Sequence, residues 1–150
     1  LGVFDEAQNT LGPPLAGSAA EGDLFHVQLR LERAESLLAL GRLDEAEAAI
    51  APSPPDWMPA ERVHAITLSI RLASLRRDHA TVLRLLDEHA PSIERMTRLR
   101  ERWLLRAVEH LARRGHVPDD ALPEDPELRR WIAARVPGLV FAVAAEGGAA

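Results

Sequence analysis

The chain has 150 residues, of which 47% are hydrophobic, and it contains no cysteine, lysine or tyrosine. Without cysteine it can form no disulfide and no thiolate zinc site, and without lysine it can form neither a Schiff base nor a phosphate-binding loop of the Walker type. A formal charge of −5 disfavours general binding to nucleic acid, and no apolar run approaches the roughly 20 residues that span a bilayer.

Helical periodicity runs through most of the chain, whereas no stretch alternates as a strand does, so an all-α fold is predicted. The first long helix is expected to begin after Asp23, a favourable N-cap, and to continue to Leu40. Gly41 ends this helix, and a shorter one covers Leu43 to Ala51 before a proline-rich stretch. Two helices joined by so short a turn form an antiparallel hairpin.

The same long-and-short pattern recurs further along the chain. A long helix from Pro59 and a shorter helix capped by Asp78 are expected to form a second hairpin. Ser92 is expected to cap a third long helix that ends at Gly115. Its apolar residues share one face: Met96, Leu99, Trp103, Ala107 and Leu111.

The last predicted element is a short helix near the C-terminus. It is opened by Asp125-Pro126-Glu127, because aspartate suits the N-cap and proline suits the first helical turn. Before it lies an acidic, proline-rich loop in which His116, Asp119 and Asp120 could meet at a metal ion if the loop curled. Ordinary solvated loop polarity is the simpler interpretation, so no metal site is predicted.

A short motif repeats within the chain. Leu1-Gly2-Val3-Phe4-Asp5-Glu6-Ala7 is matched by Leu40-Gly41-Arg42-Leu43-Asp44-Glu45-Ala46, and a weaker copy surrounds Arg77-Asp78-His79. Recurrence with such a period is typical of stacked helix hairpins. The motif resembles the tetratricopeptide repeat, in which a glycine in the turn precedes a large apolar residue, acidic residues and a small alanine at the start of the second helix.

This resemblance implies a single domain over residues 1–150, built from antiparallel helix hairpins that stack as a short right-handed α-solenoid. Residues 1–11 would form the second helix of a truncated repeat, 23–51 and 57–90 two complete repeats, and 92–136 degenerate C-terminal helices. Because the sequence begins within a repeat, we expect a fragment of a larger protein. The orphan N-terminal helix would then expose an apolar face suited to self-association.

Tetratricopeptide-like folds present the inner face of each first helix to a ligand. The resemblance therefore implies a set of partner-binding residues on the three long helices: Gln28, Glu35, His64, Thr67, Arg71, Arg102 and Glu109. It implies no catalytic residue and no cofactor.

A basic stripe is predicted on the third long helix, where Arg95, Arg98, Arg102 and Arg106 recur at helical spacing. Such a stripe could hold an acidic peptide or phosphate groups. The alternative is an ordinary solvated helix face whose arginines pair with nearby acids.

The resemblance implies a protein- or peptide-interaction module of a larger bacterial regulatory or scaffold protein, which binds through the concave face of its repeats and is not an enzyme. The alternative is a compact helical bundle that serves as an accessory or ligand-sensing domain of an enzyme or signalling ATPase. A third, metal-dependent alternative would use the His116 loop. We expect a cytoplasmic protein whose partner is protein or peptide rather than nucleic acid or membrane.

Overall fold

The computed structural model describes residues 16–96, 98–137 and 139, which form seven α-helices and one short 3-10 helix. The predicted all-α class is confirmed, and this part of the chain holds no strand. The predicted helix at residues 1–11 lies outside the described residues.

The first hairpin consists of α2 (Ala16–Ala39) and α3 (Leu43–Ile50). Gly41 joins them with a φ of 75°, the left-handed conformation that favours glycine. The prediction that α2 begins after Asp23 is wrong, because Asp23 lies inside the helix. The helix instead begins at Ala16, so the N-cap signal of Asp23 is not used.

The second hairpin, α4 (Pro59–Leu75) and α5 (His79–Glu88), follows the prediction closely. Pro59 occupies the first turn of α4, and Asp78 caps α5 by accepting a hydrogen bond of 3.2 Å from the Thr81 backbone N–H. Arg77, with a φ of 58°, takes the place that Gly41 has in the first hairpin.

The predicted third long helix is divided in two: α6 (Ala90–Glu94) and α7 (Leu99–Arg114). Ser92 is therefore not an N-cap but an internal residue of α6. The side chain of Met96 is buried in the core between the two helices, and Arg102 donates a hydrogen bond of 3.1 Å to the carbonyl of Glu94 at the end of α6. The bond from Arg102 satisfies one of the carbonyls left without a helical partner at the end of α6.

The predicted apolar stripe contributes to the core except at one position. Met96 and Ala107 are buried, and Trp103 and Leu111 pack partly buried against the second cluster, whereas Leu99 is 64% exposed. α7 also buries three apolar residues outside the stripe, Leu104, Leu105 and Val108.

The C-terminal part contains the 3-10 helix η1 (Asp119–Ala121) and α8 (Pro126–Ala133). Gly115 ends α7 in the left-handed conformation with a φ of 75°, as predicted. Asp125 caps α8 by accepting a hydrogen bond of 3.2 Å from the Glu127 backbone N–H, which confirms the predicted start of this helix.

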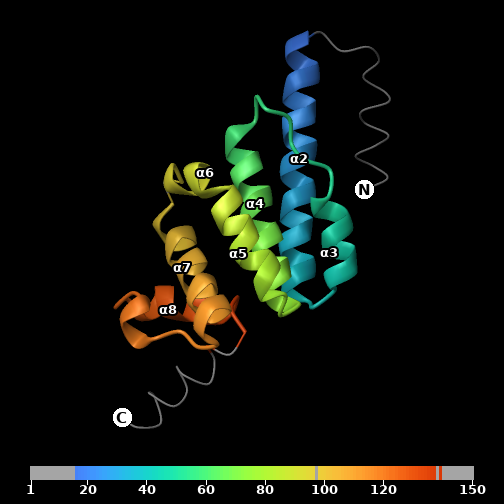
Figure 1. Cartoon of the computed structure of the whole chain (residues 1–150). Coiled ribbons are helices and arrows are strands. Elements are labelled where there is room, and N and C mark those ends of the chain that lie inside the picture. Colours follow the sequence, from blue (N-terminus) through green and yellow to red (C-terminus); the bar gives the residue numbers. More distant parts are fainter. Residues whose placement is uncertain (1–15, 97, 138, 140–150) are drawn as a thin grey trace.

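The helices pack mainly on their neighbours in the chain. Helices α2, α4 and α7 run in one direction, and α3 and α5 run in the opposite direction (Figure 1). α4 packs against α2, α3, α5 and α7, and α7 also contacts α5 and α8. Within the described residues, no helix combines the length and apolar character that crossing a bilayer requires.

Two hydrophobic clusters form the core. The first lies among α2, α3 and α4, and the second involves α4, α5, α7 and α8. α4 contributes to both, with Leu68 and Leu72 in the first cluster and Ile70 and Ala73 in the second. α4 is thus the element that joins the two halves of the core.

Candidate functional site

Several of the predicted partner-binding residues meet between α2 and α4. The Nε2 atom of His64 donates a hydrogen bond of 2.9 Å to Oε1 of Glu35, and Nη1 of Arg71 lies 3.8 Å from the same oxygen. His64 and Arg71 are two turns apart on α4, so both project from the side that faces Glu35. Two turns of α2 earlier along this face, Gln28 donates a hydrogen bond of 3.2 Å to Glu61 of α4.

Arg71 is the buried member of this group. The residue is only 5% exposed, its Nε is buried without a hydrogen-bond partner, and the guanidinium makes no hydrogen bond to the described residues. Burial lowers the pKa of the Arg71 guanidinium, and the nearby positive charge of Arg135 adds to this effect, while Glu35 opposes it. Such a group is unusual, since buried polar atoms in folded proteins are nearly always hydrogen-bonded.

Glu35 is held in its ionised form. The hydrogen bond from His64 lowers the pKa of the Glu35 carboxyl below its usual value, and this effect exceeds the opposing effect of burial. The positive charges of Arg71 and Arg135 act in the same direction as His64. A single carboxylate therefore faces three basic side chains.

Arg135, which sequence reasoning did not select, completes the site. It follows α8, its guanidinium carbon lies 4.2 Å from the centroid of the Trp131 ring, and its Nη1 donates a hydrogen bond of 2.9 Å to the Trp131 carbonyl. It is close enough to Glu35 and Arg71 for its positive charge to lower the pKa of both groups. We call Glu35, His64, Arg71 and Arg135 the Arg71 cluster.

The remaining predicted partner-binding residues do not join this cluster. Thr67 is only 4% exposed and donates its hydroxyl hydrogen bond to the Val63 carbonyl, so its side chain is not available at the surface. Arg102 bonds to the end of α6, and Glu109 pairs with Arg113 at 3.4 Å. Their role in partner binding stays a prediction.

The predicted basic stripe is not one continuous helix face. Arg95 follows the last turn of α6 and Arg98 precedes α7, so only Arg102 and Arg106 share a helix. Arg98 lies 3.6 Å from Glu101, and Arg106 lies 5.4 Å from the centroid of the Trp103 ring. The break after α6 therefore corrects the predicted geometry of the stripe.

The loop that was considered for a metal ion has other contacts. Nδ1 of His116 lies 3.3 Å from the Arg114 carbonyl, and Asp119 pairs with Arg129. Among the described residues, no group of three or more histidine and carboxylate side chains is arranged to hold a metal ion.

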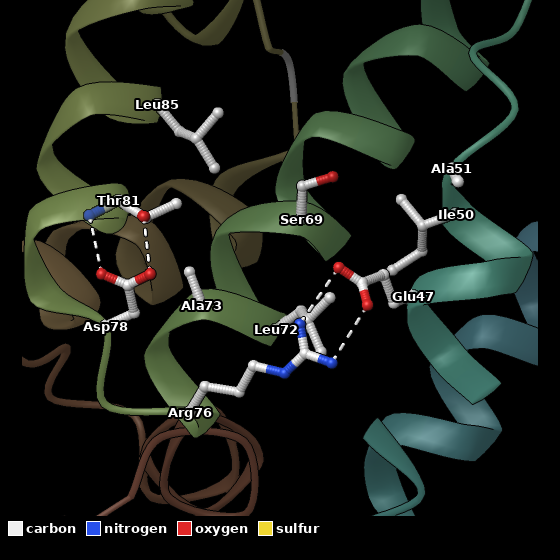
Figure 2. Close-up of a pocket in the computed structure, with 10 residues that line it drawn as sticks. All are labelled: Glu47, Ile50, Ala51, Ser69, Leu72, Ala73, Arg76, Asp78, Thr81 and Leu85. Carbon is white, nitrogen blue, oxygen red and sulfur yellow. Dashed lines mark hydrogen bonds and ion pairs between the residues drawn. The ribbon is translucent and has the colours of Figure 1, made fainter. Parts of the chain in front are cut away.

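A second feature, a groove of about 420 Å³, lies between α3 and α5 over α4 (Figure 2). Its apolar lining includes Ile50, Leu72 and Leu85, and Arg76 lies at its edge with ion pairs of 3.2 Å to Glu47 and 2.8 Å to Asp44. Sequence analysis did not predict this groove, although the small residues Ser69 and Ala73 on α4, which form its floor, are a signal for it. The charge of Arg76 is already paired with two carboxylates of the chain.

No protein-family profile, no curated protein and no solved structure matches this chain. The structure itself defines the class: an all-α domain in which the seven described helices pack in chain order.

Proposed function

We propose that this domain is a protein- or peptide-binding module whose helix hairpins stack as a short tetratricopeptide-like solenoid. The turns after α2 and α4 support the repeat, because they share a hydrogen-bond pattern. Gly41 N–H and Arg42 N–H donate to the carbonyls of Leu38 and Leu37, as Arg77 N–H and Asp78 N–H donate to those of Ser74 and Ala73. Each hairpin then buries its apolar face against the next.

The observation that carries the proposal is the Arg71 cluster. It gathers charged side chains from three separate elements on the α2–α4 face, and one of them is a buried guanidinium with no hydrogen bond to the described residues. The Glu35 side chain is 44% exposed, so the group is open to solvent on one side. An incompletely satisfied polar group beside an exposed edge favours a binding role, which needs no chemistry beyond contact with the partner.

Peptide selection tests the binding role. Peptides from a displayed random library are selected on the full chain, and their dissociation constants are measured for the Gln28→Ala/His64→Ala double variant. We expect affinity to fall about tenfold or more, because both substitutions truncate side chains on the α2–α4 face. The matched control is Arg84→Ala/Glu88→Ala, which removes an exposed ion pair on α5 and should leave affinity unchanged.

Two results would contradict the proposal. One is the absence of any selected binder, and the other is equal loss of affinity in the α5 control. The stacked arrangement is tested separately by small-angle scattering, in which a monomer should exceed the radius of gyration of about 15 Å for a compact domain of this length. A value near 15 Å would favour the compact bundle instead.

A further inference from the structure

We infer that the Arg71 cluster binds a carboxylate, supplied by an acidic side chain of the partner. The inference rests on the proposed binding function and adds the chemical class of the group that is recognised. It follows from three properties of the cluster: missing hydrogen bonds, excess positive charge and an exposed edge.

The missing hydrogen bonds belong to Arg71. A guanidinium has five N–H donors and no acceptor, so it can be satisfied only by oxygen or another acceptor atom. The nearest carboxylate oxygen, Oε1 of Glu35, is 3.8 Å from Nη1, beyond hydrogen-bond distance, and it already accepts the bond from His64. The donors of Arg71 are therefore available to a second acceptor.

The charge of the cluster indicates a monoanion. Arg71 and Arg135 carry two positive charges against the single negative charge of Glu35, so these three side chains leave an excess of one positive charge. The neighbouring Arg100 is already paired, since its Nε lies 3.4 Å from Oε1 of Glu101. One carboxylate would balance this excess, whereas a phosphate of charge about −1.5 to −2 would exceed it.

The geometry of the donors also suits a carboxylate. A guanidinium presents a planar fork that two carboxylate oxygens can accept in parallel. The side chains of Glu35 and His64 are 44% and 31% exposed, so the cluster has an edge open to solvent although Arg71 itself is covered. A carboxylate at this edge would be attracted by the positive charges of both Arg71 and Arg135.

The test is an NMR titration of the full chain that follows the Nε–H signal of Arg71, assigned by its loss in Arg71→Lys. The probes are N-acetylglutamate amide, which carries the carboxylate, its neutral analogue N-acetylglutamine amide, and inorganic phosphate. We expect a saturable shift with the carboxylate alone. Arg135→Gln should weaken this binding about tenfold, as expected when one charged hydrogen-bond donor is lost.

The matched control for charge is Arg84→Gln, which removes one positive charge from the exposed surface of α5 and should leave the titration unchanged. Three results would overturn the inference: no saturable shift with the carboxylate, an equal shift with the neutral analogue, or stronger binding of phosphate. Equal weakening in Arg135→Gln and Arg84→Gln would also overturn it, because the effect would then reflect net charge alone.

The selected peptides separate this inference from the proposed function. Peptides enriched in aspartate or glutamate, whose affinity falls in Arg135→Gln, would support both. Binders without acidic residues and insensitive to Arg135→Gln would overturn the inference and leave the binding function intact. A chain that binds the carboxylate probe but selects no peptide would contradict the function instead.

Discussion

Glu35 and Arg71 share one environment, and burial opposes the charged form of each. At Glu35 the hydrogen bond from His64 outweighs burial, so the carboxyl is ionised more readily than in a free peptide. At Arg71 burial outweighs the attraction of Glu35, so the charged guanidinium is disfavoured relative to water. The Glu35–Arg71 interaction favours the charged form of both groups, and the net effects differ because the hydrogen bond from His64 offsets burial at Glu35 whereas burial prevails at Arg71.

Glu35 makes the stability of the domain depend on pH. Because its pKa is lower in the folded chain than in the unfolded chain, its contribution is present above about pH 4.5 and is lost as the pH falls through the folded value. We expect Glu35→Gln to remove this part of the acid dependence in urea unfolding measured between pH 7 and pH 3. Glu32→Gln, an exposed change on the same helix, should retain it.

Arg71 is expected to lower the free energy of unfolding, because its guanidinium is buried without a hydrogen bond to the described residues. Replacement by methionine keeps much of the side-chain volume and removes a buried charge that lacks hydrogen bonds, so Arg71→Met should raise the free energy of unfolding by about 1 kcal/mol. Chemical denaturation measures the change. A loss of stability would instead indicate that the contact with Glu35 is worth more than the desolvation of the guanidinium.

At the level of single residues, four side chains of the α2–α4 contact were among the predicted partner-binding residues. Gln28, Glu35, His64 and Arg71 follow from helical register once the turns are located. Arg135 was not among them, because its place depends on how α8 crosses the earlier helices. The sequence does carry a local signal for Arg135. It follows Trp131 by about one helical turn, a spacing that places its guanidinium over the indole ring.

At the level of helices, the sequence predicted those helix ends that a proline, glycine or aspartate marks locally. It did not predict the helix ends that depend on the surrounding helical residues or on tertiary contacts. Pro59, Asp78, Gly115 and Asp125 each fix an end through their own backbone or side-chain chemistry. The break between α6 and α7 was not predicted: Met96, expected to be buried within one continuous helix, is buried between two separate helices.

The two helix-ending glycines should be equally sensitive to alanine. Gly41 and Gly115 both have a φ of 75°, and a Cβ atom added to either would meet no other atom within 4 Å. Each Gly→Ala substitution should therefore lower the free energy of unfolding by about 1 kcal/mol through backbone strain alone. Because the sites are far apart in the chain, the double variant should show the sum, which thermal unfolding can check.

At the level of the whole molecule, α4 is expected to couple the stabilities of the two core clusters, because it contributes buried residues to both. Leu31→Ala, which truncates a fully buried side chain of the first cluster, should cost about 3 kcal/mol. Native-state hydrogen exchange should show the largest loss of protection in α2, α3 and α4, and a smaller loss in α8. Equal loss in every helix would indicate a single cooperative bundle, and Leu40→Ala, at a position 70% exposed, serves as the control.

The order of hairpins could be predicted because consecutive helices with short turns must pack together. The position of the C-terminal segment could not, since Val136 and Leu139 enter the second core cluster through contacts remote in sequence. The Arg71 cluster combines contacts between consecutive hairpins with a contribution from the C-terminal segment. The sequence therefore indicated only the part of the cluster that lies on α2 and α4.

The fluorescence of Trp131 is sensitive to the arginines that lie beside its ring. Its ring centroid lies 4.2 Å from the guanidinium carbon of Arg135 and 5.0 Å from that of Arg100. The emission wavelength of an indole responds to charges placed so close to it, and neutralisation of Arg135 by an arriving anion would change that local field. The difference spectrum between the chain and its Trp131→Phe variant therefore isolates one natural fluorophore that reports on the neighbouring guanidinium groups without any attached dye.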